Sequence, residues 1–283
     1  MADKKTAASD VFRAPCALFL GDFNAGKSTL INALLRRDAL NTAREESMAL
    51  PTFLLRTDAP EATFAALGAD AATIHDKEHE EFLVIRQDRN NDPGYVALAG
   101  QLPALPYAHL VMVDTAGASS ETARTVDLAR ITDTAAMLAV IVTDIEYWNA
   151  RHTMEFILEQ QTRFGDGLIV VANKADHLNA SEIRRIRDKA ERRMKSFGMQ
   201  HPPRFFPLSA RLECARNATQ NEYRHRTRPE VRDLCDGGFD ALRVALYEFE
   251  AAHLRGGAPP SFGQVFGAPA FAPFIESEGS VAA

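Results

Sequence analysis

Two kinds of hydrophobic spacing alternate along the chain. Short apolar runs of strand length are separated by longer segments in which apolar residues recur at helical spacing. Continuous runs such as MLAVIV and LIVVA are typical of strands that are buried on both faces. The spacing predicts strands at Ala17–Gly21, Thr52–Thr57, Leu110–Asp114, Met137–Thr143, Leu168–Asn173 and Arg204–Leu208.

The helical spacing predicts helices at Lys27–Arg37, Ser120–Thr132, Tyr147–Phe164, Ala180–Phe197 and Phe239–Leu254. Asn179 or Ser181 can cap the start of the fourth helix, and Gly198 can end it. Because strands and helices alternate, we expect an α/β fold of three layers, in which a mostly parallel central sheet carries helices on both faces.

Two segments exceed a minimal fold of this kind. Between Asp58 and His109, ATFAAL and EFLVIR both resemble strands, and DRNNDPGY resembles a turn. We expect extra strands there, at the edge of the sheet. The polar segment Arg211–Gly238 predicts a loop with a short helix.

The two ends of the chain differ in composition from the part between them. Residues 1–13 are polar, which predicts a flexible N-terminus, and residues 14–255 carry the strand and helix patterns of one domain. Residues 256–283 are rich in glycine, alanine and proline and predict a disordered tail. Four phenylalanines in this tail could dock on the domain or on a partner.

Composition and charge restrict the classes of partner. The net charge is −6, which argues against a nucleic-acid partner. The three cysteines are not closely paired, so neither a disulfide framework nor a zinc site is predicted. No apolar stretch is long enough for a membrane span and no signal peptide is apparent, so we expect a cytoplasmic protein without direct membrane insertion.

The first strand leads into a segment with the chemistry of a phosphate-binding loop. Gly21-Asp-Phe-Asn-Ala-Gly26-Lys27-Ser28 matches the pattern G-x-x-x-x-G-K-[ST] between a strand and a helix. Glycines let the backbone curve closely, so that its N–H groups and the helix N-terminus face anionic oxygens. We expect Lys27 to reach the β- and γ-phosphates of a nucleotide and Ser28 to bind Mg²⁺. The expected phosphate-binding residues are Gly21, Asp22, Asn24, Ala25, Gly26, Lys27, Ser28 and Thr29.

A second motif closes another apolar run, in HLVMVDTAG. Asp114 stands at the end of this predicted strand, where it can hold Mg²⁺. The N–H of Gly117 is placed to meet a γ-phosphate. The D-x-x-G pattern is common by itself and gains force from the phosphate-loop motif upstream.

A third motif identifies the base. Asn173-Lys174-x-Asp176 closes the buried run LIVVAN. The Asp176 carboxylate can accept from N1–H and the N2 amino group of guanine, whereas adenine offers no such pair of donors. Asn173 would connect neighbouring loops, and the Lys174 stem would pack on the base. In FFPLSAR, Ser209 and Ala210 complete the site, with the Ala210 N–H facing guanine O6.

These motifs, in this order, resemble the GTP-binding domain of the P-loop class over about Ala14 to Leu254. The wording GDFNAGKSTLINALL is similar to the bacterial dynamin-like GTPases and, more distantly, to the Era and MnmE-like group. The long insertion between Thr52 and Asp114 favours the dynamin-like side, where extra strands stand at this place. The resemblance implies GTP and GDP as ligands, Mg²⁺ as cofactor and hydrolysis of GTP.

The resemblance also requires a switch threonine that binds Mg²⁺ together with Ser28 and Asp114. Thr52 in MALPTFLLR directly precedes a predicted strand and is preferred, and Thr42 in LNTAREES is the rival.

The residue after D-x-x-G is Ala118, which cannot orient water as glutamine does in Ras-type GTPases. The resemblance implies instead that Asn24 holds a K⁺ ion and that a homodimer across the nucleotide face assembles the site. Asn24 could alternatively stabilise its loop, and Arg44 is a second source of positive charge. Lys27, Thr52 and Asn24 are thus the candidate catalytic residues.

Three functions fit these residues. The chain could be a GTPase switch that binds an unknown protein effector, or a dynamin-like module whose membrane anchor lies in another chain. It could also be a GTP-binding scaffold with negligible hydrolysis. Measurements of hydrolysis separate the scaffold from the two GTPases.

Overall fold

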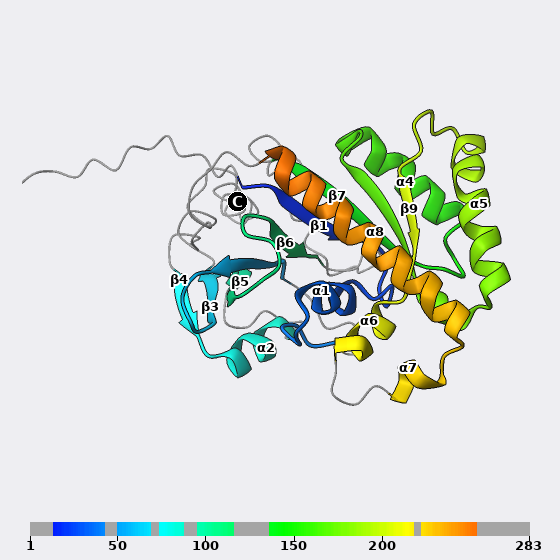
Figure 1. Ribbon diagram of the computed structural model, residues 1–283. Helices are drawn as coiled ribbons and strands as arrows, with labels where there is room; N and C mark the ends of the chain where they lie inside the picture. Colours follow the sequence, from blue (N-terminus) through cyan, green and yellow to red (C-terminus); the bar gives the residue numbers. More distant parts are fainter. Residues whose placement is uncertain are drawn as a thin grey trace, which may run out of the picture.

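The computed structural model describes residues 14–42, 50–68, 74–87, 95–115, 136–217 and 222–253. Their strands form one sheet of nine, in the order β4-β3-β5-β2-β6-β1-β7-β8-β9 (Figure 1). From the N-terminus they are β1 Cys16–Leu20, β2 Thr52–Thr57, β3 Thr63–Gly68, β4 Ile74–Lys77, β5 Tyr95–Pro103, β6 Val111–Asp114, β7 Met137–Asp144, β8 Leu168–Asn173 and β9 Arg204–Pro207. The five strands from β6 to β9 in this order pair in parallel, as the continuous apolar runs predict.

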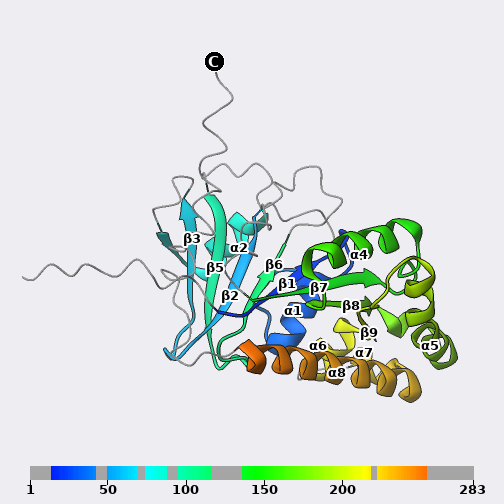
Figure 2. The ribbon, with the colours of Figure 1, turned by 90° about the horizontal axis from the view of Figure 1, so that it is seen from above.

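Helices cover both faces of the sheet, so the three-layer α/β prediction is confirmed. Figure 2 shows α4 (Arg151–Phe164) on the opposite side of the sheet from α8 (Pro229–His253). The helix α1 (Lys27–Leu35) shares the α8 face, and α5 (Ala180–Ser196) packs its apolar stripe with α4. Asn179 caps α5 in a capping box with Glu182, in which the side chain of each residue accepts from the backbone N–H of the other. Of the two predicted caps, Asn179 and Ser181, the first is therefore confirmed.

The extra strands at the sheet edge are confirmed, but one of them was assigned to the wrong segment. The run ATFAAL forms β3, whereas EFLVIR lies in a helix, α2 (His79–Gln87). Phe82, Ile85 and Arg86 are buried while Val84 is 66% exposed, which is the spacing of one helix face. A strand would have placed Phe82, Val84 and Arg86 on the same side.

The prediction of a loop with one short helix over Arg211–Gly238 underestimates its helix content. This segment contains α6 (Ala210–Asn217), α7 (Glu222–Arg226) and the first ten residues of α8. The pair Gly237-Gly238 weakens helix propensity, which suggested a later start. The backbone passes so closely there that a Cβ on Gly238 would lie 2.0 Å from the Pro207 carbonyl oxygen, so tertiary packing requires the glycine.

Other boundaries move by a few residues. The first helix ends at Leu35 because Arg36 has φ 55°, a left-handed conformation that stops it. The predicted helix at Ser120–Thr132, the N-terminal residues 1–13 and the tail lie outside the described residues. Within the part of the chain that is described, no helix is both long and apolar enough to cross a membrane.

Candidate functional site

The phosphate loop joins β1 to α1 at the carboxyl edge of the sheet, where α/β proteins bind ligands. Its curvature depends on left-handed residues, with φ 137° at Gly21, 59° at Asn24 and 91° at Gly26. A Cβ on Gly21 would lie 1.9 Å from the Val142 carbonyl oxygen. The loop is therefore shaped by contact with β7 as well as by its own sequence.

Lys27 lies inside this loop and is 7% exposed. Its Nζ donates to the carbonyl oxygens of Gly21 at 2.9 Å and Asp22 at 3.0 Å. Burial lowers the pKa of Lys27, an effect that Arg86 reinforces and that the carboxylates of Asp114 and Asp22 oppose. The ammonium group is thus held against the backbone carbonyl groups of the loop itself.

Ser28 and Asp114 meet beside the start of α1. The Ser28 hydroxyl donates to Asp114 Oδ2 at 2.7 Å, and Asp114 is fully buried. Asp114 Oδ1 is also buried and has no hydrogen-bond partner among the described residues. An unsatisfied carboxylate oxygen next to a hydroxyl fits a hard cation such as Mg²⁺, which prefers oxygen ligands.

The structure brings Thr52 to this pair. Thr52 is the first residue of β2 and stands opposite Asp114 in the antiparallel β2–β6 pair, so the two side chains share one face of the sheet. Its hydroxyl is buried and donates to the Leu50 carbonyl oxygen at 3.5 Å. Thr42 is exposed. This geometry favours Thr52 over Thr42 as the third candidate metal ligand, although Thr52 belongs to a strand rather than a loop.

Asn173 connects the phosphate loop with the base motif. Its Nδ2 donates to the Ala25 carbonyl oxygen at 2.8 Å, and its Oδ1 accepts from the Ala210 N–H at 3.0 Å. The predicted connecting role of Asn173 thus has a structural counterpart. The N–H of Ala210, which we assigned to guanine O6, is already engaged by this bond. Ser209 is buried beside it and accepts from the N–H of Leu212.

Lys174 has a left-handed backbone with φ 64°, and its Nζ donates to Asp144 Oδ2 at 2.8 Å. Sequence reasoning missed Asp144, although it directly follows the predicted strand that forms β7. The ion pair orients the Lys174 side chain across the ends of β7 and β8.

Asp176 has a partner that the sequence did not reveal. Its side chain is 2% exposed, and Oδ2 accepts a short hydrogen bond from the Tyr223 hydroxyl on α7. The guanidinium group of Arg211 lies 3.8 Å from the centre of the Tyr223 ring. Burial raises the pKa of Tyr223 to about 12, helped by the bond to Asp176, so the hydroxyl stays a donor at neutral pH. Both residues fall in the segment that we expected to be mainly loop.

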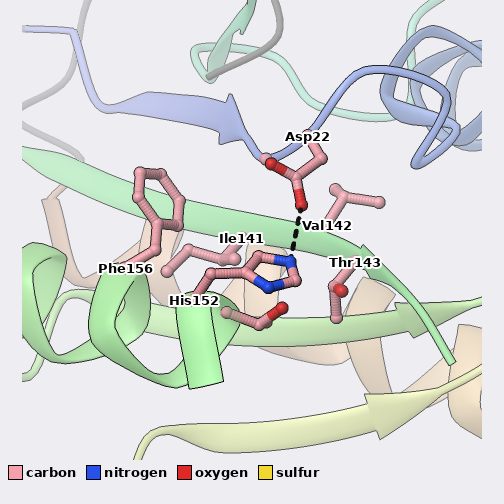
Figure 3. A pocket seen from close by; sticks show the side chains of 8 residues that line it. Asp22, Ile141, Val142, Thr143, His152 and Phe156 are labelled. Atoms are coloured by element: carbon pink, nitrogen blue, oxygen red, sulfur yellow. Dashed lines mark ion pairs between the residues drawn. The ribbon is translucent and has the colours of Figure 1, made fainter. Parts of the chain in front are cut away.

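Beside the phosphate loop, on the side of α4, lies a cavity of about 220 Å³. Figure 3 shows Asp22 and His152 facing each other across it, with Nε2 and Oδ2 3.7 Å apart. Both side chains are largely exposed, so this pair contributes little to stability. Asn24, by contrast, is exposed at the loop tip and makes no side-chain hydrogen bond with any residue in the described ranges.

Three residues named by the sequence, Gly117, Ala118 and Arg44, lie outside the described residues. The other predicted site residues come from the carboxyl ends of four strands, β1, β6, β8 and β9, with the segments that follow them, and from the first residue of β2. The phosphate loop, the Ser28–Asp114–Thr52 group and the base motif therefore lie along one edge of the sheet.

Comparison with known proteins agrees with this geometry. No curated protein matches the chain. Among solved structures, two similar chains both come from an oligomerised bacterial dynamin pair described as sensing and tethering membranes over long range. One has 13% identity and a TM-score of 0.63, and covers 87% of this chain and 48% of its own. The other has 14% identity and a TM-score of 0.55, and covers 87% of this chain and 40% of its own.

These likenesses establish the fold, that of a P-loop G domain, and this chain spans less than half the length of either structure. The family model described as "Dynamin family" matches residues 18–175, which is more than half of the 283 residues. That match contains the phosphate loop, Asp114 and Asn173. The chain therefore belongs to the dynamin family.

Proposed function

We propose that this protein binds GTP with Mg²⁺ and hydrolyses it to GDP and phosphate, as a nucleotide-dependent switch or dynamin-like module. The observation that carries the proposal is the pair of hydrogen bonds made by the Asn173 side chain. They hold the phosphate loop and the Ser209–Ala210 segment at a fixed spacing. A guanine on Asp176 and a triphosphate on Lys27 would then be bound by one rigid arrangement.

Each candidate site residue has a part in this function. Lys27 places positive charge where the β- and γ-phosphates bind, and the phosphate-loop N–H groups donate to the same oxygens. Ser28, Asp114 and Thr52 would hold Mg²⁺, which neutralises charge on the phosphates when it is bound. Asp176 accepts from guanine, and the stem of Lys174 packs on the base. The fit of a buried, unsatisfied Asp114 oxygen supports the metal assignment.

Hydrolysis by this site needs help from another group, because Ala118 cannot orient water. The Asn24 side chain is exposed and has no hydrogen-bond partner among the described residues, so it is available to an ion or to a second subunit. We propose K⁺ as that ion and a homodimer across the nucleotide face as the catalytic form. The dynamin-pair structures are themselves oligomerised, which supports the dimer only by analogy.

The K⁺ proposal predicts that GTP hydrolysis is faster in KCl than in NaCl, by at least about tenfold, since a fixed charge in the transition state has an effect of this size. Asn24→Gly should abolish the difference. Glycine tolerates the φ of 59° and removes only the side chain, so the loop shape is kept. Phosphate release across protein concentration measures both the ion effect and the dimer. Equal rates in the two salts would contradict the K⁺ proposal and favour the alternative that Asn24 stabilises its loop.

The base assignment predicts a role for Tyr223. Tyr223→Phe keeps the ring beneath Arg211 and removes the donor to Asp176. We expect GTP affinity to fall by roughly tenfold, because a hydrogen bond to a charged group helps to orient the carboxylate. Affinity for a fluorescent guanine nucleotide gives the measurement, and Tyr247→Phe, whose hydroxyl bonds only the Pro106 carbonyl among the described residues, is the control. Unchanged affinity would mean that the Tyr223 hydrogen bond does not orient Asp176 for nucleotide binding.

The scaffold alternative makes a different prediction for the same protein. A scaffold binds GTP with the same Asp176 preference but releases no phosphate in single-turnover assays, whatever the salt or protein concentration. Release of phosphate above the rate of free GTP separates the two functions. Co-sedimentation with liposomes then distinguishes a membrane-associated module from a switch.

A further inference from the structure

The helix α2 carries a buried cation that the phosphate-loop motifs do not include. Arg86 is 2% exposed and lies on the inner face of α2, next to the buried Phe82 and Ile85. Figure 1 shows α2 as part of the extension at the β3–β5 edge, remote in sequence from the phosphate loop. The guanidinium group of Arg86 nevertheless reaches the last residue of β6 and the first turn of α1.

One nitrogen of Arg86 contacts two of the three predicted metal ligands. Nη2 donates to Ser28 Oγ at 2.9 Å and to Asp114 Oδ2 at 2.5 Å. The Ser28 hydroxyl donates a hydrogen bond to Asp114 Oδ2 at 2.7 Å, so Arg86, Ser28 and Asp114 form a closed triangle of hydrogen bonds. A full positive charge therefore lies against two of the side chains that the motif assigns to Mg²⁺, on Asp114 Oδ2 rather than on the unpartnered Oδ1.

The other nitrogen holds the segment that follows α1. Nη1 donates to the Asn41 carbonyl oxygen at 3.0 Å and to Asn41 Oδ1 at 2.5 Å. The Asn41 Nδ2 in turn donates to the Leu83 carbonyl oxygen on α2 at 3.2 Å. Arg86 thus joins the metal ligands to residues beside Thr42, at the start of the connection between α1 and β2.

Arg86 and Mg²⁺ compete for the same two side chains. Mg²⁺ lies about 2.1 Å from an oxygen ligand and Nη2 lies 2.9 Å from Ser28 Oγ, so a metal on this hydroxyl would stand within roughly 5 Å of the guanidinium nitrogen. Two cations beside one buried carboxylate repel each other strongly, because the surroundings screen charge poorly. Binding of the metal therefore favours displacement of the guanidinium group.

We propose that Arg86 is an internal competitor of Mg²⁺: it neutralises Asp114 until the metal arrives with the nucleotide, and its displacement releases Asn41. The proposal rests on the guanine-nucleotide function proposed above. It makes the position of Asn41, which follows α1, sensitive to the metal through the chain of contacts Asp114 to Arg86 to Asn41. Because such coupling is reciprocal, anything that holds Asn41 in place also weakens Mg²⁺ binding.

A purely structural ion pair would behave differently. Removing one partner of a buried pair is destabilising under all conditions. A competitor's removal is compensated by Mg²⁺, which supplies the charge that Asp114 lost. The matched control is Arg243, which pairs with the buried Glu213 at 2.9 Å, far along the chain from the proposed site. Arg243→Gln should lower the melting temperature equally with and without Mg²⁺.

The first experiment uses the full chain and no nucleotide. In EDTA we expect Arg86→Gln to melt roughly 5–10 °C below wild type, because Asp114 is left uncompensated. MgCl₂ alone should restore a substantial part of this loss in Arg86→Gln and none in Arg243→Gln. An identical response of the two variants to MgCl₂ would overturn the proposal, even if the protein bound no guanine nucleotide.

The second experiment measures the free Mg²⁺ concentration at which binding of a fluorescent GDP is half-maximal. The proposal predicts a midpoint at least about fivefold lower for Arg86→Gln than for wild type. Asn41→Ala keeps the Asp114 pair and removes the Oδ1 contact to Arg86 together with the Nδ2 bond to Leu83, so it should fold and lower the midpoint in the same direction. An unchanged or higher midpoint in Asn41→Ala and in any folded Arg86→Gln contradicts competition. Failure of wild type to bind the probe contradicts the nucleotide function instead.

Discussion

Asp176→Asn is expected to lower the affinity for GTP by roughly two orders of magnitude or more and to transfer preference to xanthosine triphosphate. Guanine presents N1–H and an amino group to the carboxylate, and an amide cannot accept both. Xanthine carries an oxygen where guanine carries the amino group, so the asparagine amide can donate to it. Competition between the two nucleotides for a fluorescent analogue measures the change.

The control for this substitution is Asp188→Asn on α5, where the aspartate side chain is 63% exposed. It changes the net charge by the same amount and should leave both affinities as in wild type. The asparagine can still accept from Tyr223, so the fold around α7 should persist. Equal loss of both nucleotides in Asp176→Asn, with the protein still folded, would remove Asp176 from base recognition.

Gly26→Ala is expected to abolish nucleotide binding. Gly26 has φ 91°, and a Cβ there would lie 2.3 Å from Asn173 Nδ2. Because this nitrogen donates to the Ala25 carbonyl oxygen, the new methyl group must break the bond that joins the phosphate loop to the base motif. Affinity for a fluorescent GDP and the melting temperature together measure the effect, and we expect affinity to fall far more than stability.

Gly198→Ala separates backbone strain from the clash. Gly198 has φ 109°, and a Cβ there meets nothing within 4 Å among the described residues. Both substitutions carry a similar backbone strain of about 1 kcal/mol, but only Gly26→Ala disturbs Asn173. If the two variants lost the same stability and both still bound GDP, the Asn173 link would have no part in shaping the site.

The similarity to the dynamin pair does not assign a cellular role to this chain, so the role must be tested by experiment. The similar structures are more than twice as long as the part that this chain matches. Tethering of membranes is described for that pair, and identity of 13–14% carries the fold alone. A functional assignment must therefore come from the site, whose contacts the variants above address one at a time.

The sequence by itself determined the central strands and the phosphate loop, because both are local. A strand buried on both faces is apolar throughout, and β2 and β8 begin and end at the predicted residues. Loop glycines and a lysine at fixed spacing are equally local, since neighbouring backbone groups create the anion site. The sequence related Asp114 to Ser28 only through a shared Mg²⁺, and no local feature sets the distance between them.

Tertiary structure decided what lies around those motifs. The four apolar residues Phe82 to Ile85 fit a strand or a helix, and only packing on the sheet selects the helix that turns Arg86 inward. Tyr223 and Arg211 reach Asp176 because α6 and α7 fold back over the strand ends. Such contacts join residues that are far apart in the chain. Their energy depends on burial and distance, which a one-dimensional pattern does not contain. This is why the sequence named Asp114 and Asp176 but not Arg86 and Tyr223, which contact them.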